Sequence, residues 1–154
     1  MTGSQASLKA DECIQHHMIA SLVAGAIPFP WIGFASLTGV HLNMLRRLAI
    51  IYDVEFSTEV ARSAIAALVG SDLSVGLSLG LAKLIPGPTV VIGAVSGGLL
   101  GAASSFALGK VFVQHFESGN TFLTFDPDKV KAHYQQLFQS TVSESGSDFV
   151  GVRP

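Results

Sequence analysis

The chain has 154 residues, enough for one domain, and its formal net charge is −2. It is 49% hydrophobic and only 13% charged, whereas ordinary soluble domains are about 25% charged. The lack of a basic excess argues against nucleic-acid binding, and a single cysteine excludes an intrachain disulfide.

The first apolar region, residues 13–45, contains no Lys, Arg, Asp or Glu. It is broken at Pro28 and Pro30, and two prolines at this spacing should end one helix and start another. The piece before the break, about residues 16–27, is too short to span a bilayer. We therefore predict a hairpin that dips into the membrane, which is tolerated only where protein covers the exposed backbone. A buried helix corner in a soluble bundle is an equal alternative.

The helix after this break, about residues 31–52, becomes amphipathic toward its end. One face carries Leu37, Val40, Met44, Leu48 and Ile51, and the other carries Asn43, Arg46, Arg47 and Asp53.

A further helix is predicted over residues 58–82, with Ser57 or Thr58 as its N-cap and Glu59 in its first turn. Small residues recur every four positions along it, at Ala66, Gly70, Ser74, Ser78 and Ala82.

Residues 84–109 contain no charged residue and, at about 1.5 Å per residue, are long enough to cross a bilayer core of about 30 Å. Pro86 and Pro88 form the turn before this helix. Small residues again recur every four positions, at Gly93, Gly97, Gly101, Ser105 and Gly109. This spacing is typical of closely packed membrane helices. We therefore predict that residues 64–82 pair face to face with residues 89–109, and that the same faces support homo-oligomers.

After Lys110 polar and charged residues become frequent, as is typical of a segment outside the membrane. A turn at residues 117–120 and a short extended piece at residues 121–125 lead to a helix over residues 127–139, with Asp126 as N-cap and Pro127 in the first turn. Its apolar face should dock on protein or on a membrane surface, and consists of Val130, Tyr134, Leu137 and Phe138.

The chain is thus predicted to be all-α, in four parts. These are a flexible N-terminus (residues 1–9), a membrane-associated helical domain (10–116), a cytoplasmic turn and helix (117–140) and a flexible tail (141–154). If the first region re-enters, almost all basic residues lie on one side, which places both termini in the cytoplasm. These residues are Lys9, Arg46, Arg47, Arg62, Lys110, Lys129 and Lys131, with Lys83 alone at the opposite tip. If the first region spans once instead, the N-terminus moves to the far side.

Asp72 is the sharpest candidate site, because a carboxylate near the middle of an apolar helix costs at least about 2.5 kcal/mol and should face a cavity or a partner. It could line an ion or proton path with His41 as its polar partner. The alternative is that Gly70, Ser71 and Asp72 mark a local break or lie near the membrane interface, and that His41 is a hydrogen-bonded structural residue.

One group of residues has the spacing of metal ligands on a helix face: Glu12, Cys13, His16 and His17. Only His115 or His133 could complete it, so we expect an ordinary helix start and no metal. There is no phosphate-binding loop motif and no nucleophile elbow. We therefore expect no cofactor and no enzymatic activity.

Several ordered segments resemble a known family. They are Ile27-Pro28-Phe29-Pro30, Arg46-Arg47-Leu48-Ala49-Ile50-Ile51-Tyr52-Asp53-Val54-Glu55, Leu81-Ala82-Lys83-Leu84-Ile85-Pro86-Gly87, Ala107-Leu108-Gly109-Lys110 and His115-Phe116-Glu117-Ser118-Gly119. The chain is similar, over about residues 10–140, to the GTPase-associated domain of unknown function in YcjF-like bacterial membrane proteins. The resemblance implies a module of the bacterial inner membrane that stands alone without the GTPase domain, and it implies no reaction.

Three functions fit these observations. The first is a non-enzymatic, membrane-embedded oligomeric scaffold that presents a cytoplasmic face to a partner such as a GTPase. The second is a channel or transporter subunit with Asp72 on the path. The third is a soluble or membrane-remodelling helical assembly.

Overall fold

The computed structural model describes residues 3–27, 29–70 and 88–150. These residues form five α-helices and no strand, which confirms the all-α prediction for this part of the chain. In chain order the elements are α1 (Gly3–Gly25), α2 (Pro30–Ile51), α3 (Thr58–Leu68), α5 (Pro88–Glu117), the short 3-10 helix η2 (Phe122–Thr124) and α6 (Pro127–Val150).

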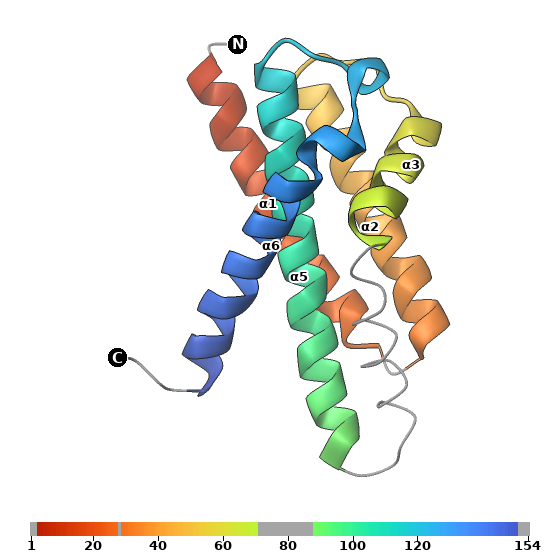
Figure 1. The fold of residues 1–154 in the computed structure, drawn as a ribbon, viewed down its shortest axis with the longest axis vertical. Coiled ribbons are helices and arrows are strands. Elements are labelled where there is room, and N and C mark those ends of the chain that lie inside the picture. Colours follow the sequence, from red (N-terminus) through yellow and green to blue (C-terminus); the bar gives the residue numbers. More distant parts are fainter. Residues whose placement is uncertain (1–2, 28, 71–87, 151–154) are drawn as a thin grey trace.

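Helix α5 is the centre of the molecule, and α1, α2 and α6 pack along it (Figure 1). Helices α1 and α2 form a hairpin whose turn lies part of the way along α5, so that α5 extends beyond it (Figure 1). Helix α3 covers α2 and α6 near the opposite end of the molecule.

Several helix boundaries agree with the sequence analysis. Pro30 is the first residue of α2 and Pro88 is the first residue of α5, whereas Pro28 and Pro86 lie outside the described residues. The Val60 backbone N–H donates to the Ser57 hydroxyl at 3.4 Å, which makes Ser57 the N-cap of α3.

The start of α6 is fixed in the same way. The Asp128 backbone N–H donates to the Asp126 carboxylate at 3.2 Å, and Pro127 begins the helix as predicted. Tyr134 is fully buried, and Val130, Leu137 and Phe138 pack beside it on the core. The predicted apolar face of this helix therefore docks on protein.

Aromatic rings fill the core where α5, η2 and α6 meet. Phe112 on α5 stacks on Phe125 with ring centroids 4.2 Å apart, and Phe122 lies 5.3 Å from both Phe112 and Phe56. These contacts fix the chain between α5 and α6, because Phe122 turns into the core. Residues 122–124 form a 3-10 helix and not the predicted extended piece.

Three predicted helix limits differ from the structure. Helix α1 begins at Gly3, inside the predicted flexible start, because Ala6 and Ala10 are buried in a helix interface. Helix α6 continues to Val150 through much of the predicted tail. The hydroxyls of Ser140, Thr141 and Ser143 donate to carbonyl oxygens of the preceding turn, so these polar side chains find their hydrogen-bond partners within the helix.

The third difference concerns the helix predicted over residues 58–82. Helix α3 ends at Leu68, two residues before Gly70. Glycine in a helix costs about 1 kcal/mol relative to alanine, so a helix end is favoured there. Asp72, Ser74 and Ser78 lie outside the described residues.

Candidate functional site

The described part of the small-residue stripe of α5 packs against α1. A Cβ added at Gly101 would lie 2.5 Å from the Ser21 carbonyl oxygen, and one added at Gly98 would lie 2.7 Å from that of Leu22. A Cβ at Gly25 would overlap the Gly97 carbonyl. At these positions the stripe meets α1, whereas the predicted partner was residues 64–82, of which 71–82 lie outside the described residues.

Two more positions continue this contact along the stripe. A Cβ at Gly109 would lie 2.6 Å from the Ile14 side chain. Ser105 and Ser21 share a buried hydrogen bond of 2.5 Å. The residues that match run in opposite directions along the two helices, so α1 and α5 are antiparallel. Gly93 lies in α5 beyond the end of α1.

The sequence signal for this partner was present but was missed. Helix α1 buries small residues at helical spacing, namely Ala6, Ala10, Ser21 and Ala24. They are interrupted by Ile14 and His17, so the pattern is less regular than the glycine spacing of α5.

His41 is buried between α2 and α5. Its Nε2 lies 3.2 Å from the Ser104 hydroxyl, which also donates to the Gly101 carbonyl oxygen. Among the described residues, its Nδ1 has no hydrogen-bond partner. The proposed pairing of His41 with Asp72 lies outside what the structure describes, because residue 72 is not among the described residues.

The metal-like spacing at the start of the chain does not produce a cluster. His17 is buried, and its Nδ1–H donates to the Cys13 carbonyl oxygen at 2.7 Å. His16 is exposed, and its Nδ1–H donates to the Glu12 carbonyl oxygen at 2.9 Å. His115 donates to the Thr121 carbonyl oxygen at 2.9 Å. Within residues 3–27, 29–70 and 88–150, no three His, Cys, Asp or Glu side chains converge to hold a metal ion. His133 is among the residues to which this applies.

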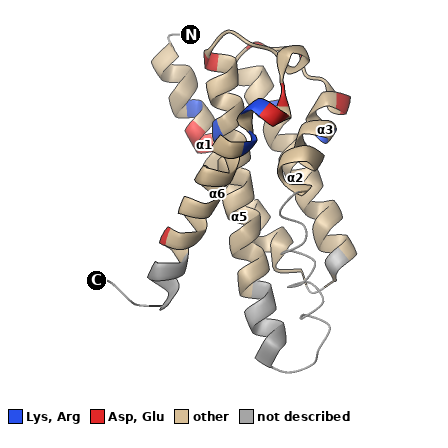
Figure 2. Cartoon of the chain, viewed as in Figure 1, with Lys and Arg blue, Asp and Glu red and all other residues tan. Residues whose placement is uncertain are grey.

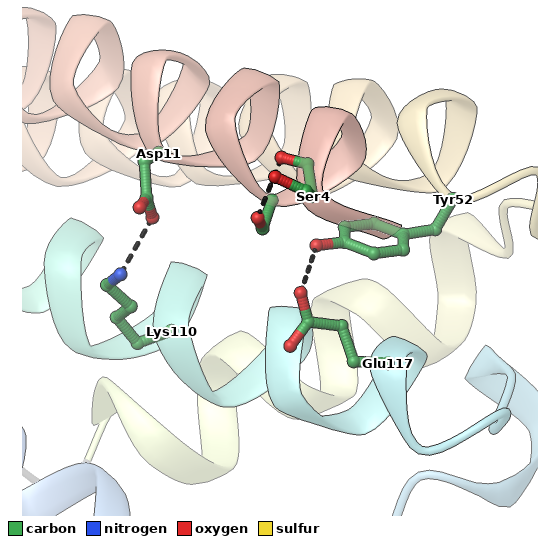
Figure 3. Close-up of polar contacts among 6 residues, drawn as sticks. Ser4, Asp11, Tyr52, Lys110 and Glu117 are labelled. Carbon is green, nitrogen blue, oxygen red and sulfur yellow. Dashed lines mark hydrogen bonds and ion pairs between the residues drawn. The ribbon is translucent and has the colours of Figure 1, made fainter. Parts of the chain in front are cut away.

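Two polar contacts tie the helices together near the ends of α2 and α5 (Figure 3). Lys110 on α5 forms a 2.7 Å ion pair with Asp11 on α1. The Tyr52 hydroxyl, just after α2, donates to the Glu117 carboxylate at 2.8 Å. Burial, with help from the Glu117 carboxylate, raises the pKa of Tyr52 above its usual range, so this hydroxyl stays a donor.

Charge divides the molecule into two ends. The apolar end consists of residues 13–27, 29–45 and 88–109, which include no Lys, Arg, Asp or Glu. The charged end holds the opposite parts of the same helices together with α3 and η2. Figure 2 shows the described charges gathered there, apart from one carboxylate on the lower part of α6.

The apolar end also exposes large apolar side chains. Trp31 is 82% exposed and lies at the start of α2, next to the hairpin turn. The other exposed large apolar residues of this end are Ile19, Leu22, Val23, Phe29, Ile32, Phe34 and Val95. Such a concentration on one region marks an interaction surface, because scattered single residues are the normal pattern.

A groove runs between α1 and α2, where the two ends meet. Its larger part has a volume of about 620 Å³ and is lined by His16, His17, Ala20, Ser36, Gly39, Val40, Asn43 and Arg47. A smaller part of about 300 Å³ adjoins it through His16 and Arg47 and is lined also by Lys9, Glu12, Cys13, Ile50 and Ile51.

The single cysteine lies in the smaller part of this groove. Burial raises the pKa of the Cys13 thiol, and the positive charge of Arg47 partly opposes the effect. Sequence reasoning treated Arg46 and Arg47 alike, but only Arg47 lines the groove.

Among the described residues, one helical segment is long and apolar enough to cross a membrane, Val95–Glu117 of α5. Within its most apolar stretch 61% is buried by the rest of the protein. The central helix of a soluble bundle would pass the same test. Length and composition alone therefore do not confirm the predicted pair of embedded hairpins.

Comparison with known proteins adds two findings. Residues 2–143 match the family described as Domain of unknown function (DUF697). The chain is also 32% identical over 136 residues to Magnetosome membrane protein 22 of Magnetospirillum gryphiswaldense, a match that covers 86% of this chain and 70% of the relative. No solved structure matches the chain.

Proposed function

The chain belongs to the DUF697 family of domains of unknown function, and we propose that it is a non-enzymatic scaffold embedded in a membrane by its apolar end. The observation that carries this proposal is the cluster of exposed apolar side chains around Trp31, at an end of the molecule without charges. The naming of a 32% identical relative as a membrane protein supports it.

The lengths of the helices favour a hairpin that enters the bilayer without crossing it. Lys110, paired with Asp11, marks the border between the charged and apolar ends. From there to Gly97, beside the end of α1, is about 20 Å, and to Pro88 about 33 Å, at about 1.5 Å per residue. Against a hydrocarbon core of about 30 Å, α5 crosses while the α1–α2 turn stops past the middle.

The charged end then lies in the cytoplasm with both termini, at the inner membrane of a bacterium. Helix α6 separates from α5 along its lower half, which runs down beside the apolar end (Figure 1). Because this half carries Ser and Glu side chains, we expect it to swing outward onto the membrane surface when the protein is embedded. The charged end is the face available to a cytoplasmic partner such as a GTPase supplied by another chain. Copies of the protein associate through apolar surface that remains outside the bundle.

The depth of Trp31 tests this arrangement directly, because it is the only tryptophan. We expect its fluorescence in vesicles to be quenched more strongly by lipids brominated near the ends of their acyl chains than by lipids brominated near the headgroup. The control is Trp31→Phe combined with Leu123→Trp, since Leu123 is 84% exposed at the charged end. That tryptophan should be quenched by aqueous iodide and by neither lipid.

The outcome separates the alternatives. Quenching of Trp31 by headgroup-proximal bromine alone would place the hairpin on the surface, as in a membrane-remodelling assembly. Full quenching by iodide with no effect of bromolipids would show a soluble helical assembly. Either result would overturn the embedded scaffold.

A further inference from the structure

The groove between α1 and α2 changes in character along its length. At its apolar end it is lined by Ala20, Gly39 and Val40 together with the small Ser36, and a Cβ added at Gly39 would meet no atom within 4 Å. This part can therefore take an apolar chain without moving the backbone.

At the other end the groove is basic. Lys9 and Arg47 line it with a single carboxylate, that of Glu12, which leaves the positive charge in excess. Within the described residues, neither Lys9 nor Arg47 forms an ion pair. A guanidinium without a carboxylate partner is a strong donor to phosphate oxygens.

The position of the groove adds a third constraint. Its basic part lies where the charged end begins and its apolar part lies within the apolar end, so it crosses the proposed membrane surface. A ligand with an anionic head and an apolar chain matches both parts at once, whereas a free anion matches only one.

We propose that this groove binds one anionic glycerophospholipid, with its phosphate on Arg47 and Lys9 and an acyl chain along Ala20, Gly39 and Val40. The inference rests on the proposed membrane function. The Asn43 amide, which also lines the groove, can donate a further hydrogen bond to the headgroup. The bound lipid then fixes the depth of the hairpin in the membrane.

Native mass spectrometry of the full-length protein in non-ionic detergent tests the assignment, with phosphatidylglycerol and phosphatidylcholine as probes. We expect one phosphatidylglycerol to be retained, at least about tenfold more tightly than phosphatidylcholine, and Arg47→Gln to lose about tenfold in that affinity. The matched control is Arg46→Gln, which removes the same charge one residue away and outside the groove. It should stay within about twofold of the wild type.

A second pair of variants tests the acyl-chain part. Gly39→Leu fills the groove and should abolish retention, whereas Ala35→Leu places the same side chain at an exposed position of α2 outside the groove and should not. Equal losses in Arg46→Gln and Arg47→Gln, or retention in Gly39→Leu, would overturn the proposal. Inorganic phosphate that displaces the lipid at equal concentration would show a free-anion site and would overturn it too.

The Trp31 measurement distinguishes failure here from failure of the membrane function. If acyl-chain bromine quenches Trp31 in wild type and in Arg47→Gln, and both retain phosphatidylglycerol equally, only the groove assignment is wrong. If bromolipids quench Trp31 neither in the wild type nor in any of the variants, the membrane function itself is wrong and the inference falls with it.

Discussion

Gly101 is the residue at which the absence of a side chain matters most, because it lets α5 approach the backbone of α1 at Ser21. We predict that Gly101→Ala lowers the free energy of unfolding by roughly 1–3 kcal/mol, since the added methyl meets a carbonyl oxygen that cannot rotate away. The measurement is denaturant unfolding in detergent micelles followed by circular dichroism.

Gly39→Ala is the control for this prediction, because it makes the same change in open space on α2. It should raise stability by up to about 1 kcal/mol through helix propensity alone. Gly109→Ala should lie between the two, since it contacts the Ile14 side chain, which can shift. Equal effects at Gly101 and Gly39 would mean that α1 does not contact α5 in this register.

Cys13 gives a pH prediction. Because burial raises its pKa and Arg47 lowers it, the thiolate forms at higher pH than in a free cysteine. The rate of maleimide alkylation should therefore reach its midpoint at a higher pH than free cysteine does, and Arg47→Gln should move the midpoint further up. Cys13→Ser with Leu123→Cys supplies an exposed reference thiol. A midpoint at or below that reference contradicts the predicted environment.

At the scale of elements, the described side chains that pack α6 on the core all lie in its first half. Tyr134 is fully buried on the core, whereas no described residue from 140 to 145 is buried. Tyr134→Ala should cost about 3 kcal/mol or more in unfolding free energy, through lost packing and a cavity. Deletion of residues 140–154 should cost less than about 1 kcal/mol. A larger loss from the deletion than from Tyr134→Ala would show that the lower half of α6 packs on the bundle.

The elements themselves were largely predictable, because their ends are set by local chemistry. Proline at residues 30 and 127, the Ser57 cap and the Asp126 cap act within a turn of the chain, and each appears where the sequence places it. The helix was predicted to continue to residue 82, with a local break at Gly70 as the alternative, and α3 ends at Leu68 close to that alternative.

The partner of a helix face was not predictable in the same way. A four-residue spacing of small residues shows which face can be approached closely, but both α1 and the segment after Ala64 offer such faces. Proximity in sequence favoured the neighbour, and the structure instead brings Ser21 to Ser105. The groove was missed for the same reason, since it exists only once Arg47 and Gly39 on α2 face His16 and Ala20 on α1.

At the scale of the whole molecule, the packing of α5 bears on how copies would associate. The stripe residues Gly101, Ser105 and Gly109 are occupied by α1, so they are closed to a second copy. We predict that Ile19→Ser with Phe34→Ser, on the exposed apolar surface, reduces the mass of the detergent-solubilised particle, measured by light scattering. Gly101→Ala should lower stability and leave the mass of the folded fraction unchanged. A monomeric particle from Gly101→Ala with intact helicity would restore the stripe as the contact between copies.

The contact between Ser21 and Ser105 spans 84 residues of sequence, and this distance has a consequence for biosynthesis. At about 5–20 residues per second, a ribosome needs about 4–17 s to make the chain between them. During that time Ile14 and Ser21 of α1 lack the helix that buries them, because α5 does not yet exist. We therefore expect the nascent hairpin to need a lipid surface or a chaperone before translation ends, which makes the timing of delivery part of folding.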